Sequence, residues 1–166
     1  TFFSPYRGDR LFGGEKRYVP GLPFGKPGEY LTDRLTDEGL GVMRKAGNQP
    51  FFLYLAHHAP HTPVEAKAET VDHYRRKLKP GMRHQNPTYA AMVHSLDESV
   101  GRVMTELRDR RIEDRTVVIF TSDNGGYLQA SDGTKVTTNH PLRSGKGSLY
   151  EGGVRVPLIV KWPGGT

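Results

Sequence analysis

The chain has no cysteine among its 166 residues. This absence excludes a disulfide scaffold, a thiol nucleophile and any zinc or iron–sulfur site held by cysteine, although it leaves the redox compartment undecided. Hydrophobic residues are also few, at 35%, and no apolar run approaches the roughly 18 residues that a membrane-spanning helix needs. With 20 Gly and 12 Pro, much of the chain is expected to be loop, which excludes a compact all-helical bundle.

The charge balance favours anionic partners. Lys and Arg number 24 against 18 Asp and Glu, which gives a net charge of +6 with seven His uncharged. The basic stretch 75–79 is typical of a solvated surface, with nucleic-acid or heparin contact as the alternative. No aromatic residues interleave with it, so we expect no nucleic-acid partner. Because the chain begins with Thr1 and ends on the turn-like 162–166, we expect an internal piece of a longer protein.

The first half of the chain predicts loop, helix and strand in that order. Residues 1–29 are rich in Gly, Pro and charge and show no sustained period, which indicates a loop. Apolar spacing predicts a helix over 30–46. The unbroken apolar run 51–56 predicts a strand buried on both faces, as parallel sheets require. Residues 64–86 are polar and basic, and indicate a surface excursion or a weak helix.

The second half contains the clearest predicted element. Asn86 suits a helix N-cap and Pro87 the first helical position, and apolar residues then recur at helical spacing as far as Leu107. A buried strand is predicted over 116–121, a long loop over 125–149, and a third strand over 156–160 at a sheet edge. These elements predict an α/β fold with a mostly parallel central sheet flanked by helices.

Two of the predicted strands end in polar residues, where ligands collect in open α/β sheets. Asp123 and Asn124 follow the second strand, and their oxygens suit Ca²⁺ or Mg²⁺. Such cations take six or more oxygens, so two residues cannot form the whole site. The alternative is that Asn124 and Gly125 only make a tight turn.

Three histidines, His57, His58 and His61, follow the first strand. A zinc site on one helical face is excluded because Pro60 and Pro63 prevent a helix there. His61 is the candidate proton donor, base or anion contact, and the alternative is a solvated loop histidine.

Lys146 lies between two glycines, where the backbone could approach an anion while the ammonium supplies positive charge. The surrounding sequence is not a Walker A loop, because the earlier glycine and a preceding buried strand are missing. A flexible basic surface loop is the alternative.

Three segments, taken in order, closely resemble the type I sulfatases, the arylsulfatase branch of the alkaline phosphatase superfamily. They are PFFLYLAHHAPHTP (50–63), VIFTSDNG (118–125) and LRSGKGSLYEGGVRVP (142–157). The similarity extends from about Gly28 to Pro163, and residues 1–27 add little to it. We therefore expect 1–27 to be a loop-rich stretch and 28–166 to be part of a sulfatase catalytic domain with an incomplete alkaline phosphatase-like sheet.

The resemblance implies hydrolysis of aryl or carbohydrate sulfate esters at a Ca²⁺ site, with a formylglycine hydrate as nucleophile. It implies that Asp123 and Asn124 are metal ligands, that His61 lies near the leaving-group oxygen, and that Lys146 binds the sulfate. The charge of the cation and of Lys146 would offset that of the sulfate oxygens, while His61 could donate a proton to the departing oxygen.

The sequence also departs from the family pattern. The family's nucleophile motif, Cys/Ser-x-Pro/Ala-x-Arg, is missing, because Ser4-Pro5-Tyr6-Arg7 has the wrong spacing. The Asp-Asp metal ligands and the Lys-x-His segment of the family are missing too, and all would precede Thr1. We therefore expect this chain alone to be inactive.

Two other functions stay open. One is a phosphodiester or phosphonate hydrolase of the same superfamily, which would bind two transition-metal ions. The other is a non-catalytic module that holds sulfated glycans through the basic stretch 75–79. The resemblance further implies a periplasmic, secreted or lysosomal protein, while the oligomeric state and the particular sulfate ester are not predicted.

Overall fold

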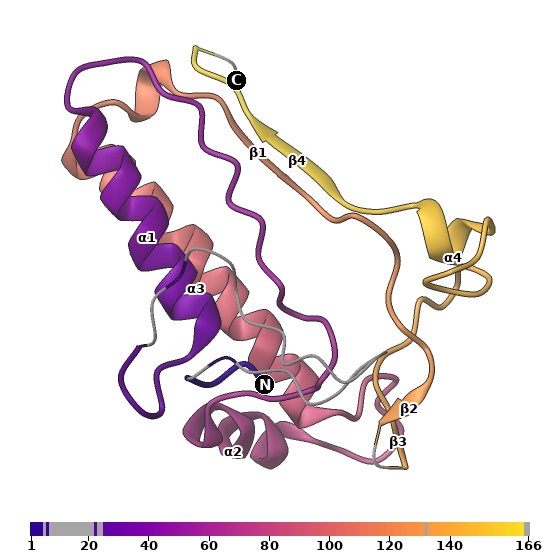
Figure 1. The fold of residues 1–166 in the computed structure, drawn as a ribbon. Coiled ribbons are helices and arrows are strands. Elements are labelled where there is room, and N and C mark those ends of the chain that lie inside the picture. Colours follow the sequence, from indigo (N-terminus) through magenta and orange to yellow (C-terminus); the bar gives the residue numbers. More distant parts are fainter. Residues whose placement is uncertain (5, 7–21, 23–24, 132, 165–166) are drawn as a thin grey trace, which may run out of the picture.

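The computed structural model describes residues 1–4, 6, 22, 25–131 and 133–164. Most of the loop predicted over 1–29 therefore lies outside the described residues, and the division at residue 27 stays a prediction. The elements are α1 (Leu31–Ala46), α2 (Ala68–Lys77), α3 (Pro87–Asp109), the 3-10 helix η1 (Glu113–Arg115), β1 (Val118–Thr121), β2 (Ala130–Ser131), β3 (Thr134–Lys135), α4 (Glu151–Val154) and β4 (Leu158–Lys161) (Figure 1).

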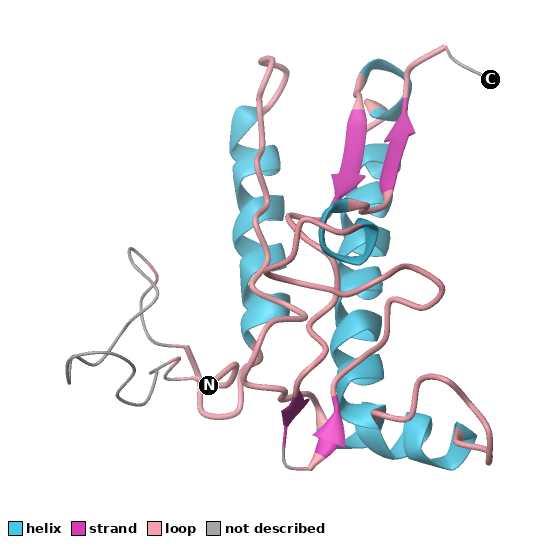
Figure 2. Ribbon diagram, turned by 90° about the vertical axis from the view of Figure 1, so that its right-hand side faces the viewer, coloured by secondary structure: helices cyan, strands magenta, loops and turns pink. Residues whose placement is uncertain are grey.

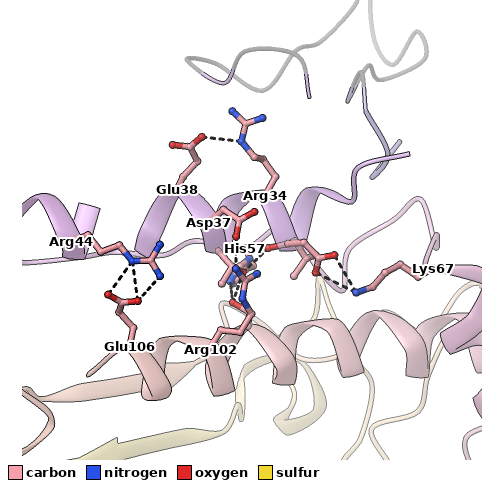
Figure 3. A network of polar contacts seen from close by, with 12 residues as sticks. Arg34, Asp37, Glu38, Arg44, His57, Lys67, Arg102 and Glu106 are labelled. Carbon is pink, nitrogen blue, oxygen red and sulfur yellow. Dashed lines mark hydrogen bonds and ion pairs between the residues drawn. The ribbon is translucent and has the colours of Figure 1, made fainter. Parts of the chain in front are cut away.

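Helices α1 and α3 lie side by side and run in the same direction (Figure 1). Ion pairs across their interface advance together along both helices, since Asp37 pairs with Arg102, and Arg44 pairs with Glu106 at 2.6 Å (Figure 3). The predicted cap of α3 is present, because Asn86 Oδ1 accepts a hydrogen bond from the backbone of the third helical residue at 2.9 Å. The two long helices form the layer on which the extended segments rest.

The contact between α1 and α3 is lined by small polar side chains. The Thr36 hydroxyl is fully buried and lies 2.7 Å from both the Thr32 carbonyl oxygen and the Ser99 hydroxyl. Ser99 in turn lies 2.8 Å from Nε2 of His57. Small hydroxyls let the helices approach closely, and their mutual hydrogen bonds offset the cost of burying them.

Two apolar clusters complete the core. One gathers Met43 and Leu107 at the C-terminal ends of α1 and α3, and the other gathers Tyr30, Leu31 and Met92 near their N-terminal ends. Helix α2 packs on α3. The segment 64–86, predicted as a surface excursion or a weak helix, therefore contains a helix. Among the described residues, no helix is long and apolar enough to cross a membrane.

Strands β1 and β4 form an antiparallel ladder, with Val118 opposite Lys161 and Thr121 opposite Leu158. Residues 51–58 are extended, and they belong to no ladder within the described part of the chain. Both views show this segment and β1 running in the same direction, against that of α1 and α3 (Figures 1 and 2). The loops that follow the two segments therefore leave at the same end of the molecule.

The burial predicted for 51–56 is wrong for one of its faces. Phe51, Leu53 and Leu55 face α1 and α3, whereas Phe52 and Tyr54 are 92% and 81% exposed. Side chains alternate across an extended chain, so a single helical layer covers only every second residue. The described residues provide no layer for the opposite face.

Candidate functional site

The loop after β1 carries the two candidate metal ligands. Thr121 Oγ1 donates to the Pro157 carbonyl oxygen at 3.0 Å, which ties the end of β1 to the segment leading into β4. Asn124 Nδ2 donates to the Gly125 carbonyl oxygen at 3.0 Å, so the Asn124 side-chain oxygen is turned away from this bond. Asp123 is exposed, and its carboxylate makes no hydrogen bond or ion pair with any described residue.

The oxygen atoms of Asp123 and Asn124 are the right kind of ligand for a hard divalent cation, but two residues are too few to form the whole site. One carboxylate and one amide oxygen are the ligand types that Ca²⁺ takes from proteins, yet Ca²⁺ takes six to eight oxygens. Across 1–4, 6, 22, 25–131 and 133–164, no group of three or more His, Asp or Glu residues could hold a metal ion. Asp123 and Asn124 therefore fit one side of a cation site, and no His, Asp or Glu elsewhere in the described residues joins them in a group of three.

The loop that carries Lys146 is joined directly to the loop after β1. The Lys146 backbone N–H donates to the Gly126 carbonyl oxygen at 3.1 Å, and the Gly125 N–H donates to the Gly153 carbonyl oxygen at 2.9 Å. The Gly152 N–H donates to the Arg143 carbonyl oxygen at 2.8 Å and closes the second loop on itself. The Lys146 side chain is exposed. Backbone hydrogen bonds thus hold the candidate cation ligands and the candidate sulfate-binding lysine on one joined unit.

The close approach of the two loops requires glycine at several positions, because a side chain there would clash with a neighbouring backbone segment. A Cβ on Gly125 would lie 1.8 Å from the Gly152 carbonyl oxygen, and one on Gly145 would lie 2.4 Å from the Gly126 carbonyl oxygen. A Cβ on Gly152 would lie 2.1 Å from the Ser144 carbonyl oxygen. The sequence pattern indicated close approach of the backbone to an anion, whereas the structure shows close approach of two backbone segments to each other.

His61 lies at the tight turn that follows the extended segment 51–58. Its backbone N–H donates to the His58 carbonyl oxygen at 2.9 Å, and Ala59, inside the turn, is buried in the apolar core. His61 Nδ1 lies 2.8 Å from the Thr62 carbonyl oxygen. A carbonyl oxygen only accepts, so Nδ1 carries the proton and Nε2 remains for another partner.

No hydrogen bond or ion pair joins His61 to either of the other two loops within the described residues. What relates them is the common direction of 51–58 and β1, which brings both following loops to the same end of the molecule (Figures 1 and 2). The structure therefore joins Asp123, Asn124 and Lys146 through their loops, and places His61 on a separate loop at that end.

Two polar residues that the sequence did not single out hold these loops. Asn139 hydrogen-bonds to both the loop after β1 and the loop of Lys146. His57 anchors the start of the His61 loop on Ser99 of α3, and burial, with a smaller contribution from the charge of His58, lowers the pKa of His57 below its ordinary value. Neither role is visible in the sequence, because each depends on contacts between distant residues.

The basic stretch 75–79 lies at the end of α2 and just beyond it. Arg75, Arg76 and Lys77 occupy the last turn of the helix, where cations suit the helix dipole. Arg75 is paired with Asp72, and Arg76, Lys77 and Lys79 are exposed. This stretch is a solvated surface in the structure.

A family model described as "Sulfatase" matches residues 4–166. The chain belongs to the sulfatase family. A curated relative, "Sulfatase" from Formosa agariphila, is 41% identical over 155 residues, which are 87% of this chain and 27% of the relative. Human N-acetylgalactosamine-6-sulfatase is 37% identical over 152 residues, which are 89% of this chain and 27% of the relative. This chain therefore spans about 27% of the length of each of these sulfatases.

The fold is shared with solved sulfatase structures. A crystal structure of Ps i-CgsB in complex with k-i-k-neocarrahexaose superposes with a TM-score of 0.73 at 41% identity, over 87% of this chain and 30% of that one. The predicted α/β fold and the resemblance to sulfatases are both confirmed. The small antiparallel β1–β4 ladder is consistent with an incomplete domain of this fold.

Proposed function

We propose that the full-length protein carrying this chain hydrolyses sulfate esters, and that Asp123, Asn124, His61 and Lys146 belong to its active site. Membership of the sulfatase family supports the reaction. The observation that carries the site assignment is the direct junction of two loops, in which the Lys146 N–H donates to the Gly126 carbonyl oxygen at 3.1 Å. This bond holds the Lys146 backbone against Gly126, which lies three residues after Asp123 and two residues after Asn124.

Each residue has a distinct role in this proposal. The Lys146 ammonium binds a sulfate oxygen and offsets its negative charge, while Asp123 and Asn124 hold a Ca²⁺ ion from one side. His61 keeps one ring proton on Nδ1, which faces the Thr62 carbonyl oxygen. When protonated also on Nε2, it donates that proton to the departing ester oxygen. A bound Ca²⁺ ion would supply positive charge beside the sulfate.

The nucleophile is assigned to sequence outside this chain. The family resemblance implies a formylglycine, and this chain has neither a cysteine nor the motif that surrounds the precursor residue. Residues 1–166 alone are therefore expected to release no sulfate. A comparison of this chain with the full-length protein, purified side by side, tests the point.

The proposed substrate is a sulfated carbohydrate. Relatives include N-acetylgalactosamine-6-sulfatases, and a neighbour of the same fold is bound to a carrageenan oligosaccharide. Ion chromatography of the sulfate released from sulfated oligosaccharides and from 4-nitrophenyl sulfate tests this. A location outside the cytoplasm, implied by the family resemblance, stays a prediction that cell fractionation tests.

Variants of the full-length protein test the site assignment. Lys146→Ala, His61→Ala and Asp123→Ala are each expected to lower kcat/KM by at least about 100-fold, and Asp123→Ala to weaken Ca²⁺ binding as well. Lys79→Ala is the matched control, because Lys79 is also an exposed lysine on a loop but lies outside the proposed site. Its activity is expected to stay within about twofold of the wild type.

The outcomes separate the alternatives. Full activity in Lys146→Ala and His61→Ala would overturn the site assignment. Two bound transition-metal ions together with phosphodiester cleavage would favour the phosphohydrolase. Salt-sensitive heparin binding that Lys79→Ala weakens, with no sulfate released by the full-length protein, would favour the glycan-binding module.

A further inference from the structure

The Asn139 side chain bridges the two joined loops. Its Oδ1 accepts a hydrogen bond from the Gly126 N–H at 3.0 Å. Its Nδ2 donates to the Gly126 carbonyl oxygen at 2.9 Å and to the Ser144 carbonyl oxygen at 3.1 Å. Gly126 N–H is a donor and needs an oxygen opposite it, so these partners fix the orientation of the amide. The Asn139 amide thus donates to and accepts from the backbone of Gly126, as the backbone of a neighbouring strand would. Its bond to Ser144 also holds the loop of Lys146.

The Asn139 amide lies close against two glycines. A Cβ on Gly126 would lie 2.8 Å from Asn139 Oδ1, and a Cβ on Gly145 would lie 2.7 Å from Asn139 Nδ2. Gly145 is buried, so the amide is packed between two glycines whose missing side chains create its site. The neighbouring Thr137 is buried as well.

The bridge connects the two halves of the candidate site. Asp123 lies three residues before Gly126, and Lys146 lies two residues after Ser144. The Gly126 carbonyl oxygen also accepts the Lys146 N–H at 3.1 Å, so Asn139 and Lys146 share one acceptor. A shift of Gly126 therefore moves the Asp123 loop and the Lys146 backbone together.

We infer that Asn139 is a positioning residue, which sets the distance between the cation-binding residues and the sulfate-binding lysine through Gly126 and Ser144. The inference rests on the proposed function for its effect on activity, whereas the bridge itself can be measured without activity. Loss of the amide is expected to misplace Lys146 relative to Asp123 without unfolding the protein. Misplacement by about 1 Å costs an enzyme up to about 100-fold in rate.

Two variants of the full-length protein test it. Asn139→Ala removes all three hydrogen bonds, and Asn139→Asp keeps the volume and one acceptor but loses both donors. Thr116→Val is the matched control, because it also removes one side-chain-to-backbone hydrogen bond, the 2.7 Å bond to the Ile112 carbonyl oxygen. That bond lies before β1, at the opposite end of the strand from the site.

The measurements are kcat/KM for sulfate release, the inhibition constant of inorganic sulfate, the melting temperature, and amide hydrogen exchange. Both Asn139 variants are expected to lose about 10- to 100-fold in kcat/KM and to bind inorganic sulfate more weakly. They are expected to stay folded but to melt below Thr116→Val, because each loses more than one hydrogen bond. In Asn139→Ala the Gly126 and Lys146 amides are expected to exchange at least about tenfold faster, because the first loses its acceptor and the second its fixed partner. In Asn139→Asp the Gly126 N–H keeps an oxygen to donate to, so only the Lys146 amide is expected to exchange faster there. Thr116→Val is expected to change neither these amides nor kcat/KM.

Unchanged exchange at Gly126 and Lys146 in both Asn139 variants would overturn the bridge. Faster exchange with kcat/KM within about twofold of the wild type would overturn its role in positioning. If the wild-type protein releases sulfate from no ester, the proposed function fails, and the exchange measurement still decides whether Asn139 joins the two loops.

Discussion

Replacing Gly152 by Ala would test the junction of the two loops by steric means. The new Cβ would lie 2.1 Å from the Ser144 carbonyl oxygen and 2.5 Å from that of Arg143, whereas ordinary contact begins at 3.4 Å. Both obstacles are backbone atoms, so no side chain can rotate away. The 143–144 segment must therefore move by about 1 Å, and Lys146 is only two residues from Ser144.

The expected result has two parts. Overpacking of this kind costs about 1–3 kcal/mol of unfolding free energy, which urea denaturation of the full-length protein measures. A displacement of about 1 Å near Lys146 is expected to lower kcat/KM for sulfate release by up to about 100-fold.

Gly41→Ala is the control for the glycine itself. Gly41 lies within α1, and a Cβ there would meet nothing within 4 Å. Alanine is better than glycine inside a helix by about 0.5–1 kcal/mol, so this variant is expected to be slightly more stable and fully active. If Gly152→Ala matched Gly41→Ala in stability and activity, the close contact of the two loops would be refuted.

Three further predictions concern the helical layer. Thr36→Val removes a fully buried hydroxyl that bonds within α1 and to Ser99, and is expected to lower the unfolding free energy in urea by about 1–2 kcal/mol. Burial lowers the pKa of His57 below its ordinary 6.5, so as the pH falls the unfolded state binds the imidazole proton before the folded state does. The unfolding free energy is therefore expected to fall as the pH drops below about 6.5, and His57→Gln is expected to remove part of that loss, measured by urea titrations at pH 5 and 7. Glu106→Gln breaks the 2.6 Å pair with Arg44 and is expected to lower the melting temperature in 50 mM NaCl, and by less in 1 M NaCl.

Local patterns predicted the helices well. Asn86, Pro87 and the helical spacing of apolar residues placed the start of α3 correctly, because a cap and an amphipathic face are both encoded in neighbouring residues. The segment 64–86 was harder, since its polar composition fits either a loop or the exposed helix α2.

Burial of the extended segment 51–56 could not be predicted from its composition alone. Phe52 and Leu53 are both strongly apolar, yet Phe52 is 92% exposed while Leu53 packs in the core. Whether each face is covered depends on layers formed by distant sequence. The same reason explains why 51–56 pairs with no strand within the described part of the chain, because hydrogen bonds between strands need a neighbour that local sequence does not specify.

The sequence named the residues of the candidate site, and these stay a prediction, but it did not indicate how their loops are held together. Strand ends and the family resemblance singled out Asp123 and Lys146. The structure adds that the loops of both residues are joined through Gly126, and that Asn139 bridges them. The loop 125–149 has no periodic pattern, so nothing local identifies an asparagine that bonds to a residue 13 positions earlier.

The most direct test is a crystal structure of the full-length protein with Ca²⁺ and inorganic sulfate. We expect the cation within about 2.3–2.6 Å of oxygens from Asp123 and Asn124, and a sulfate oxygen within hydrogen-bonding distance of Lys146 Nζ, with His61 Nε2 facing the same anion. A sulfate bound away from Lys146, or a cation held without Asp123, would contradict the assignment of these loops to one active site.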